Sequence, residues 1–294
     1  MNLRSFLPEQ VRQPIRRAYV AIGKAAPGLR CEPDFIVIGA QRCGTTSLFR
    51  ALNQHTDIVR PTFSKGVNYF DLNYDEGPGW YAGHFPTRHF AGRESSRVDG
   101  PVAFEASGYY MFHPLAVPRL ASDLPNIKLV AMLRDPVERA YSAWKHERAR
   151  GFEHEAFEQA LALEDERLDG EVDKMIADHR YQSHAHRHQA YRRRGEYARL
   201  LESVVEHIPR ERVHVMYSES FFASPEQEFG RLCSFLDVAD PVSIEYERHN
   251  ARPSRSMPEG AREQLRRHFE PLDAQLAEFV GHAPPWGHGR TPSC

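Results

Sequence analysis

The stretch FIVIGAQRCGTTSL occupies residues 35–48 and contains the strongest local signal in the chain. Its first four residues form a short apolar run rich in β-branched side chains, which predicts a buried strand over 35–38. The run stops at Gly39, and a helix is predicted from Thr45 onward. A glycine-containing turn between a strand and a helix lets backbone N–H groups approach and point at an anion. The stretch therefore predicts a phosphate-binding loop.

The side chains of this loop add groups that suit an anion. Arg42 supplies a fixed positive charge with a planar set of donors, and Thr45 and Thr46 supply hydroxyls. The spacing from Gly39 to Gly44 matches a Walker A loop, but Thr45 stands where that motif has its lysine. Because hydrolysis of a nucleoside triphosphate normally needs that lysine on the phosphates, ATP hydrolysis is not expected. A P-loop kinase that uses ATP is the alternative interpretation.

The rest of the chain continues the alternation of strands and helices. Further apolar runs over residues 127–133 and 213–217 predict strands, whereas residues 138–206 and 262–280 have mostly helical patterns. Strands that alternate with helices predict βαβ units and a parallel sheet. The expected fold class is therefore α/β, with a central parallel sheet flanked by helices.

The composition excludes several classes of protein. The chain has 294 residues, with 38 Lys+Arg and 40 Asp+Glu, so its formal net charge of −2 is too balanced for a bulk nucleic-acid binder. No apolar run approaches the roughly 18–20 residues of a membrane-spanning helix. The four cysteines are widely spaced without a CxxC pair, so no zinc site is indicated, and a reducing, cytoplasmic compartment is expected.

The N-terminal segment differs from the rest in charge. Residues 1–30 are basic and carry apolar side chains at helical spacing. We expect a helical arm that packs on a single domain formed by residues 31–290. A basic amphipathic helix that lies on an anionic membrane surface is the alternative interpretation.

Two polar clusters are expected to be solvated surface. These are HAHRH at residues 184–188 and RRR at residues 192–194. For the three arginines, attraction of an anionic acceptor such as a sulfated or uronic sugar is the alternative interpretation. No carboxylate is spaced with the three histidines for chelation, so no metal site is predicted there.

The phosphate loop resembles the 5′-phosphosulfate loop of sulfotransferases that use 3′-phosphoadenosine-5′-phosphosulfate (PAPS). The similarity is to the branch with glycosaminoglycan sulfotransferases and bacterial relatives, whose pattern is roughly G-x-x-K/R-x-G-T-T-x-L. Arg42 stands where many members carry lysine. The resemblance implies that the 5′-phosphosulfate is held by Arg42, Cys43, Gly44, Thr45, Thr46 and Ser47.

A second stretch, LRDPVERAYS at residues 133–142, is similar to the 3′-phosphate motif of the same family. The resemblance implies that Arg134 and Ser142 bind the 3′-phosphate. Arg134 follows a predicted strand, at the edge of the sheet where ligands of open α/β folds bind. Arg252 and Arg255 lie where the family has a basic loop that closes over the nucleotide.

The resemblance extends over residues 33–288 and implies a P-loop-kinase-like sulfotransferase fold. PAPS would be the co-substrate, 3′,5′-adenosine diphosphate (PAP) the product, and no metal would be needed. The implied reaction transfers the sulfuryl group to a hydroxyl or amine of a small-molecule or carbohydrate acceptor, by in-line displacement. Lys65, in KGVNYFD at residues 65–71, matches the family segment K-E-P-H-[FY]-F-D and is expected, with Arg42, to stabilise the leaving phosphate.

The general base is where the sequence departs from the family pattern. Gly66 and Asn68 stand where the family has glutamate and histidine, and neither accepts a proton usefully. Asp71 matches the family aspartate, and Glu105 lies in a neighbouring motif, so these two are the first candidates, with His113 next. The same departure leaves a non-catalytic nucleotide-binding protein as another interpretation.

Overall fold

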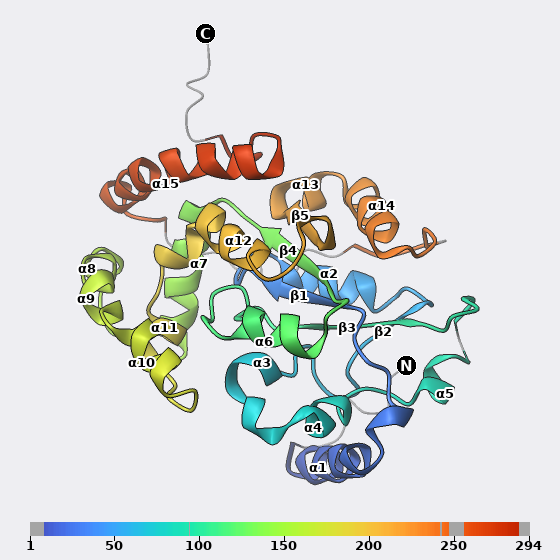
Figure 1. The fold of residues 1–294 in the computed structure, drawn as a ribbon. Coiled ribbons are helices and arrows are strands. Elements are labelled where there is room, and N and C mark those ends of the chain that lie inside the picture. Colours follow the sequence, from blue (N-terminus) through green and yellow to red (C-terminus); the bar gives the residue numbers. More distant parts are fainter. Residues whose placement is uncertain (1–8, 94, 242, 247–255, 288–294) are drawn as a thin grey trace.

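Figure 1 shows the fold in the computed structural model, which describes residues 9–93, 95–241, 243–246 and 256–287. A central five-stranded sheet lies between layers of helices. In spatial order its strands are β2 (Ile58–Val59), β3 (Val102–Ala106), β1 (Phe35–Gly39), β4 (Lys128–Leu133) and β5 (Val213–Tyr217). The four pairings between these strands are parallel, which confirms the predicted α/β class.

Helices cover both faces of the sheet (Figure 1). One face is covered by α3 (Tyr69–Leu72), α4 (Pro78–Ala82), α6 (Ala116–Asp123) and α12 (Tyr197–Val205). The other is covered by α2 (Thr45–Leu52), α13 (Ser218–Ala223) and α14 (Pro225–Leu236). A third core joins α7 (Pro136–Ala149), α8 (Phe157–Ala162) and α15 (Glu259–Val280). The remaining helices are α1 (Glu9–Ala25), α5 (Arg88–Ala91), α9 (Glu164–Leu168), α10 (Glu171–Ala177) and α11 (His184–His188), with short 3₁₀ turns at Pro27–Leu29, Tyr74–Glu76, Arg193–Gly195 and Arg210–Arg212.

Strand β1 illustrates why the sheet strands are uninterrupted apolar runs. All five of its residues are buried. Ile36 and Ile38 pack in the core on the side of α6 and α12, whereas Phe35 and Val37 pack on the side of α2 and α14. Because both faces are covered, the strand shows no alternation of apolar and polar residues. Burial of each of these side chains stabilises the fold by about 1.5–3 kcal/mol.

The order of the strands creates a switch point at β1. The chain places β2 and β3 on one side of β1, and β4 and β5 on the other. Residues 40–44 connect β1 to α2, and Arg134 and Asp135 connect β4 to α7. Asp135 caps α7, because its Oδ1 accepts a hydrogen bond from the backbone N–H of Val137 at 2.9 Å, with Pro136 at the first helical position. Ligands of open α/β sheets bind at the carboxyl ends of strands beside such a switch point.

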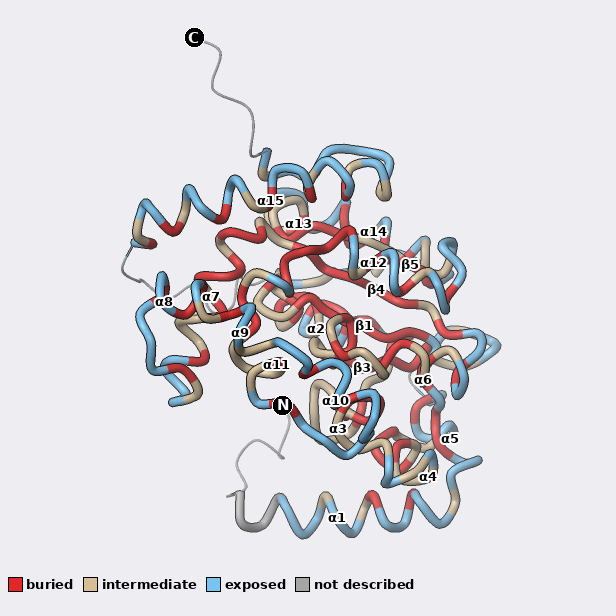
Figure 2. Tube along the Cα trace, turned by 60° about the vertical axis from the view of Figure 1, so that its left-hand side comes forward, coloured by how far each residue is buried: buried red, intermediate tan, exposed pale blue. Residues whose placement is uncertain are grey.

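Helix α1 packs closely against α4. A Cβ atom on Gly23 would lie only 2.4 Å from the Cα of Gly83, so this approach requires glycine. The hydroxyl of Tyr19 and the Nη1 of Arg30 both donate to the carbonyl of Phe85, at 3.2 and 2.9 Å. Figure 2 shows α1 as mostly exposed or intermediate, in contrast to the buried central strands. Among the residues that the structure describes, no helix is both long and apolar enough to cross a membrane.

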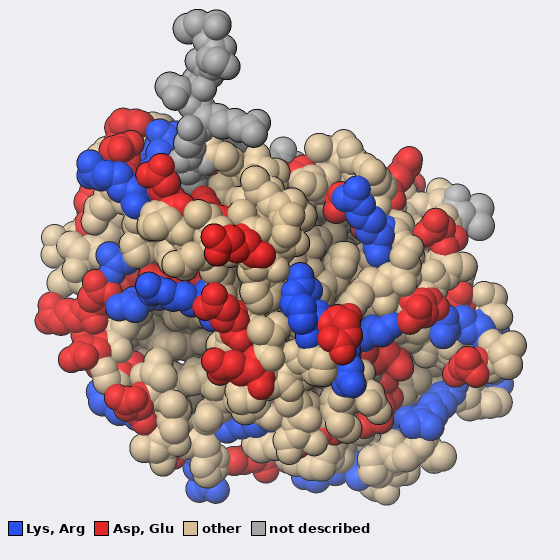
Figure 3. All heavy atoms as spheres, turned by 45° about the horizontal axis from the view of Figure 1, so that its top comes forward, with Lys and Arg blue, Asp and Glu red and all other residues tan. Residues whose placement is uncertain are grey.

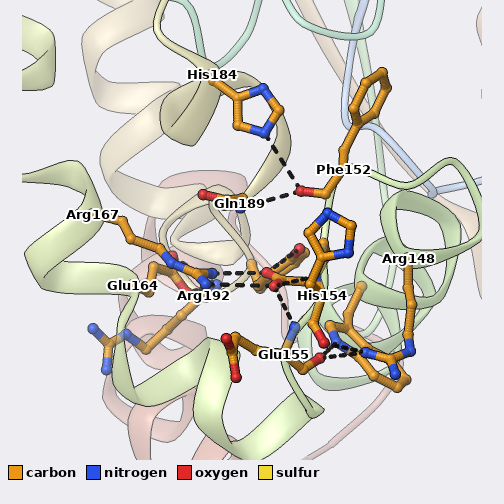
Figure 4. A network of polar contacts seen from close by, with 12 residues as sticks. Arg148, Phe152, His154, Glu155, Glu164, Arg167, His184, Gln189 and Arg192 are labelled. Carbon is orange, nitrogen blue, oxygen red and sulfur yellow. Dashed lines mark hydrogen bonds and ion pairs between the residues drawn. The ribbon is translucent and has the colours of Figure 1, made fainter.

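A buried polar network fixes the helices that follow α7 (Figure 4). The carboxylate of Glu153 accepts hydrogen bonds from Arg167 at 2.7 Å and from the hydroxyl of Tyr191 at 3.0 Å. The carboxylate of Glu164 accepts one from the backbone N–H of Arg192 at 2.8 Å. Buried carboxylates need such partners, since an unpaired buried charge is strongly destabilising. The network therefore positions the segment after α11 beside the carboxyl edge of the sheet.

Candidate active site

A cavity of about 550 Å³ opens at the carboxyl edge of β1 and β4. Its walls come from the phosphate loop, the loop that carries Lys65, one side of α7, and the segment around α11. Of the residues predicted from the sequence, those that line it are Arg42, Gly44, Thr45, Thr46, Ser47, Lys65, Asp71, Arg134 and Ser142. The cavity therefore brings together three motifs that are far apart in the sequence, and its volume suits a nucleotide-sized ligand.

The lining is strongly cationic although the chain is nearly neutral. Seven lysine or arginine side chains line the cavity, against two acidic ones, Asp71 and Glu138. Across the face shown in Figure 3, basic and acidic side chains are intermingled, so the basic charge does not form a broad patch there. Positive charge that is concentrated inside a cavity attracts a small polyanion more strongly than an extended polyanion.

The phosphate loop has the backbone geometry that an anion site needs. Gly44 has a φ of 89° and precedes the first residue of α2. A side chain there would be strained by that φ, and its Cβ would lie 3.2 Å from the Oγ of Ser218. The N-terminus of α2 faces the cavity through Thr45 and Thr46, so the helix dipole adds positive potential to the hydroxyl donors.

Lys65 holds its ammonium group over the start of α2. Its Nζ donates to the Oγ1 of Thr45 at 2.8 Å and lies 3.4 Å from the Oγ1 of Thr46. Burial lowers the pKa of Lys65 to about 8. The phosphate loop itself lacks the Walker lysine. Lys65, from a separate segment of the chain, places an ammonium group against the loop instead.

Arg42 connects the phosphate loop to α7. Its backbone has a φ of 73°, in the left-handed region that few non-glycine residues adopt. The Nε of Arg42 donates to the Oγ of Ser142 at 3.2 Å, and its Nη1 lies 3.4 Å from the Nδ1 of His146. The two motifs that the sequence separates by about a hundred positions are therefore joined by a direct side-chain contact.

Cys43 lies on the other side of the loop from the cavity. It is completely buried, with its Sγ 3.5 Å from the hydroxyl of Tyr197. Burial raises the pKa of the Cys43 thiol to about 11. The cysteine side chain does not line the cavity, so it packs the loop against α12. Arg252 and Arg255 lie outside the described residues.

Asp71 has the properties of a proton acceptor. Its carboxyl group lines the cavity and is buried. The Oδ1 accepts a hydrogen bond from the backbone N–H of Leu72 at 2.7 Å, whereas the Oδ2 has no hydrogen-bond partner among the described residues. Burial, and then the nearby charge of Glu105, raise the pKa of Asp71 to about 7.

Glu105 is placed differently. It is completely buried, and both carboxylate oxygens are occupied. One accepts hydrogen bonds from the backbone N–H of Val67 at 2.6 Å and the hydroxyl of Ser107 at 2.7 Å, the other from the hydroxyls of Tyr81 at 3.0 Å and Tyr110 at 2.9 Å. Glu105 does not line the cavity. A carboxylate that accepts from four donors anchors the neighbouring loop, and this arrangement favours Asp71 over Glu105 as the base.

His113 also lies away from the cavity. Its Nδ1 accepts a hydrogen bond from the backbone N–H of Leu115 at 3.2 Å, and burial lowers the pKa of the ring to about 3. A ring that accepts a structural hydrogen bond and protonates only in strong acid is a poor general base near neutrality. The structure therefore disfavours His113, the third candidate from the sequence.

The structure also explains why glycine replaces the family glutamate at position 66. A Cβ atom on Gly66 would lie 2.6 Å from the carbonyl oxygen of Ala106 and 2.6 Å from the Oγ of Ser107. The loop carrying Lys65 thus lies directly on the end of β3. No side chain fits at this position unless the loop or the strand moves.

Replacing Gly66 by alanine is expected to destabilise the fold by about 1–3 kcal/mol, because the new methyl group meets backbone atoms. Gly28→Ala is the matched control: nothing lies within 4 Å of its Cβ position, and no positive φ is involved. That control should change the unfolding free energy by less than about 0.5 kcal/mol. Urea denaturation of both variants checks the prediction, and equal stability of the two would contradict the close approach.

Arg194 lines the cavity, although a solvated surface was the preferred expectation for its arginine cluster. Its guanidinium is buried and lies 4.9 and 4.8 Å from the ring centroids of Tyr109 and Phe112. It donates to the carbonyl of His186 at 2.7 Å and to the side-chain oxygen of Gln41 in the phosphate loop. Burial lowers the pKa of Arg194 to about 10. The expectation of a solvated polar surface is therefore wrong for Arg194.

His186 is likewise buried rather than solvated. Its Nδ1 lies 2.7 Å from the hydroxyl of Tyr109, which lines the cavity. Burial lowers the pKa of this histidine to about 3, so the ring is neutral and fixes the tyrosine. No group of three or more His, Cys, Asp or Glu side chains that could hold a metal ion occurs in the described part of the chain.

Comparisons with known proteins agree with this geometry. The family model of the sulfotransferase domain matches residues 32–257. The chain belongs to the sulfotransferase family, which confirms the resemblance found in its motifs. This assignment does not favour the kinase interpretation.

Two curated relatives and one solved structure illustrate the similarity. The chain is 40% identical over 116 residues to the membrane-associated sulfotransferase kil1 of Dictyostelium discoideum, covering 40% of this chain and 23% of the relative. It is 29% identical over 230 residues to the bifunctional heparan sulfate N-deacetylase/N-sulfotransferase of Drosophila melanogaster, covering 74% of this chain and 20% of the relative. A crystal structure of a sulfotransferase from Alicyclobacillus acidocaldarius superposes with a TM-score of 0.64 at 28% identity, covering 86% of this chain and 98% of that one. The matched region thus spans about a fifth of the length of these two curated relatives.

Proposed function

We propose that this protein transfers a sulfuryl group from PAPS to a hydroxyl or amine of a carbohydrate or small-molecule acceptor. The observation that carries the proposal is the cationic cavity in which Lys65, Thr45 and Thr46 meet Arg42 and Ser142. Membership of the sulfotransferase family supports the reaction class. The named activity of the Drosophila relative on heparan sulfate supports a carbohydrate acceptor.

The cavity offers a place for each charged group of the donor. The 5′-phosphosulfate would lie at the phosphate loop, facing Lys65 and the N-terminus of α2. The 3′-phosphate would lie at the start of α7, between Arg134 and Ser142. These side chains supply cations and hydroxyl donors themselves, so we propose that transfer needs no metal.

The chemistry follows from these positions. The acceptor oxygen or nitrogen forms a bond to sulfur as the bond from sulfur to the bridging oxygen breaks, and that oxygen leaves with the electron pair on PAP. Lys65 and the two threonine hydroxyls stabilise the charge that develops on the leaving group. Asp71 takes the acceptor proton on its unpaired Oδ2.

The acceptor would enter the cavity beside Asp71. Asn68, Tyr109 and Arg187 line the cavity together with Asp71. The tyrosine is held by His186, so it forms a fixed wall rather than a mobile one.

A cytoplasmic location stays a prediction from the sequence.

A turnover assay tests this function. The full chain is incubated with PAPS, EDTA and separate acceptors: amino sugar oligosaccharides, uronic acid oligosaccharides, phenols and alkyl alcohols. We expect one of these classes to gain sulfate, with one PAP released per sulfated product, in the presence of the chelator. Phosphorylation of an acceptor from magnesium-ATP, with no transfer from PAPS, would contradict the proposal.

A further inference from the structure

Helix α1 presents an outward face that consists only of apolar residues. The structure describes the side chains of this helix from Gln13 to Ala25. At about 100° per residue, the exposed apolar positions fall within about 120° of the helix circumference. They are Pro14, Ile15, Ala18, Ala21, Ile22 and Ala25. Ile15 is 45% and Ile22 is 67% exposed. Single exposed apolar side chains are ordinary, but a continuous apolar face marks a contact surface.

This face is not the one that holds α1 on the domain. The opposite side packs against α4, with Val20 and Gly23 buried there. The hydroxyl of Tyr19 donates to the carbonyl of Phe85 from the packed side. In Figures 1 and 2, α1 lies along the outer edge of the molecule, beyond α4. The apolar face is therefore turned outward, and its residues remain exposed in the part of the chain that the structure describes.

Positive charge lies beside the apolar face. Arg17 and Lys24 are both exposed and are seven residues apart, which puts them on the same border of this face. Residues 13–25 contain three Lys or Arg and no Asp or Glu. Residues 1–30 contain six Lys or Arg and one Glu, although the formal net charge of the whole chain is −2. An apolar face bordered by cations is complementary to an anionic lipid bilayer, which offers acyl chains together with negative headgroups.

A second copy of the chain is a poorer occupant of this face. In an antiparallel pair of α1 helices, Arg17 and Lys24 of one copy would lie near the same residues of the other. Helices that associate through an apolar stripe ordinarily place opposite charges beside it. Residues 13–25 offer no acidic side chain for such pairs. The local charge therefore favours an anionic surface over another copy of this chain.

We propose that the outward face of α1 docks this protein on an anionic lipid bilayer. The helix would lie in the plane of the interface, with Ile15 and Ile22 directed towards the acyl chains and with Arg17 and Lys24 at the headgroup phosphates. Its other side stays packed on α4, so the helix lies on the bilayer and does not cross it. No described residue of α1 lines the active-site cavity. The docking therefore goes beyond the proposed sulfuryl transfer and does not depend on it.

Co-sedimentation of the full chain with lipid vesicles tests this proposal. One kind of vesicle contains phosphatidylcholine alone, and the other contains equal parts of phosphatidylcholine and phosphatidylglycerol. We expect the chain to bind the mixed vesicles at least about 10-fold more strongly, because each basic residue near an anionic surface contributes about 5-fold. The difference should shrink in high salt, which screens these charges.

Replacement of the two large apolar side chains tests the face itself. The double variant Ile15→Ser, Ile22→Ser should bind the mixed vesicles at least about 10-fold more weakly, because it removes most of the apolar area that enters the interface. The matched control is Ile176→Ser, at a 56% exposed isoleucine on α10, whose first turn carries Glu171 and Asp173. This control should bind as the wild type does. Since all three isoleucines are exposed, thermal unfolding of these variants should match that of the wild type.

The charged border is tested by the double variant Arg17→Gln, Lys24→Gln. Binding to the mixed vesicles should fall about 10–30-fold, whereas the weak binding to phosphatidylcholine alone should stay the same. Lys174→Gln removes an exposed lysine on α10 and is the matched control, so it should change neither.

The outcomes separate a bilayer from the other occupant. Equal binding of the wild type and the double serine variant would overturn the proposal, as would equal binding of the wild type to the two kinds of vesicle. Sedimentation equilibrium without lipid should give the same mass for both proteins. A dimer that the double serine variant dissociates, with no binding to vesicles, would assign the face to a second copy. PAP affinity without vesicles should be the same in all variants, so a failure of the proposed function is seen separately.

Discussion

Lys65→Ala is expected to lower kcat about 10³-fold, because the ammonium group that contacts both threonines of the phosphate loop is lost. The leaving oxygen gains negative charge only as its bond to sulfur breaks. A cation that is already in place beside this oxygen therefore stabilises the transition state more than it stabilises bound PAPS. Lys65→Arg should recover part of the rate. Initial rates of PAP release with a saturating acceptor give the measurement.

The same lysine makes donor binding depend on pH. Burial lowers the pKa of Lys65 to about 8, so the charged form that binds an anion is present below this value and is lost as pH rises through it. PAP affinity in the wild type should therefore fall above pH about 8, and Lys65→Met should lack this step. An identical pH dependence in wild type and variant would show that Lys65 does not contact the 5′ end of the donor.

Asp71→Asn is expected to lower kcat by about 10²–10⁴-fold, the contribution typical of general base catalysis. The asparagine keeps the size of the side chain but cannot accept the proton of the acceptor. PAP affinity should change by less than about 3-fold, since Asp71 holds no part of the donor. The matched control is Asp75→Asn, at an exposed aspartate that pairs with Arg180 outside the cavity, which should leave kcat unchanged.

The pH profile of kcat tests the same role independently. Burial and the charge of Glu105 raise the pKa of Asp71 to about 7, so its deprotonated, basic form accumulates as pH rises through this value. Wild-type kcat should therefore increase with pH up to about 7 and then level off, and Asp71→Asn should lack this limb. A variant that keeps both the rate and the wild-type profile would assign the base to another group.

The sequence predicted the parts of the site that depend on local pattern. The strand, loop and helix over residues 35–52 follow from an apolar run, two glycines and a helical spacing, all of which lie within a few residues of one another. The cap by Asp135 is also local, because the side chain binds the backbone two positions on. The motifs of the family predicted that one cavity would contain Arg42, Lys65, Arg134 and Ser142.

The sequence could not predict which polar groups find partners inside the fold. Glu105 and Asp71 have similar carboxyl groups, yet Glu105 is held by four donors that come from three separate segments. Arg194 belongs to a basic run typical of surface helices, but Tyr109 and Phe112 from another segment cover it. These contacts depend on how segments far apart in the sequence pack together. The type of a residue and its spacing from its neighbours do not predict that packing.

The most direct test of the central claim needs no knowledge of the acceptor. Calorimetric titration of the wild-type chain with PAP, 5′-AMP and magnesium-ATP, the first two in EDTA, compares the three nucleotides in one experiment. The account predicts that PAP binds at least about 10-fold more tightly than 5′-AMP, since the 3′-phosphate gains charged hydrogen bonds, and that magnesium-ATP binds more weakly than PAP. Equal affinity for PAP and 5′-AMP, or a preference for magnesium-ATP, would contradict it.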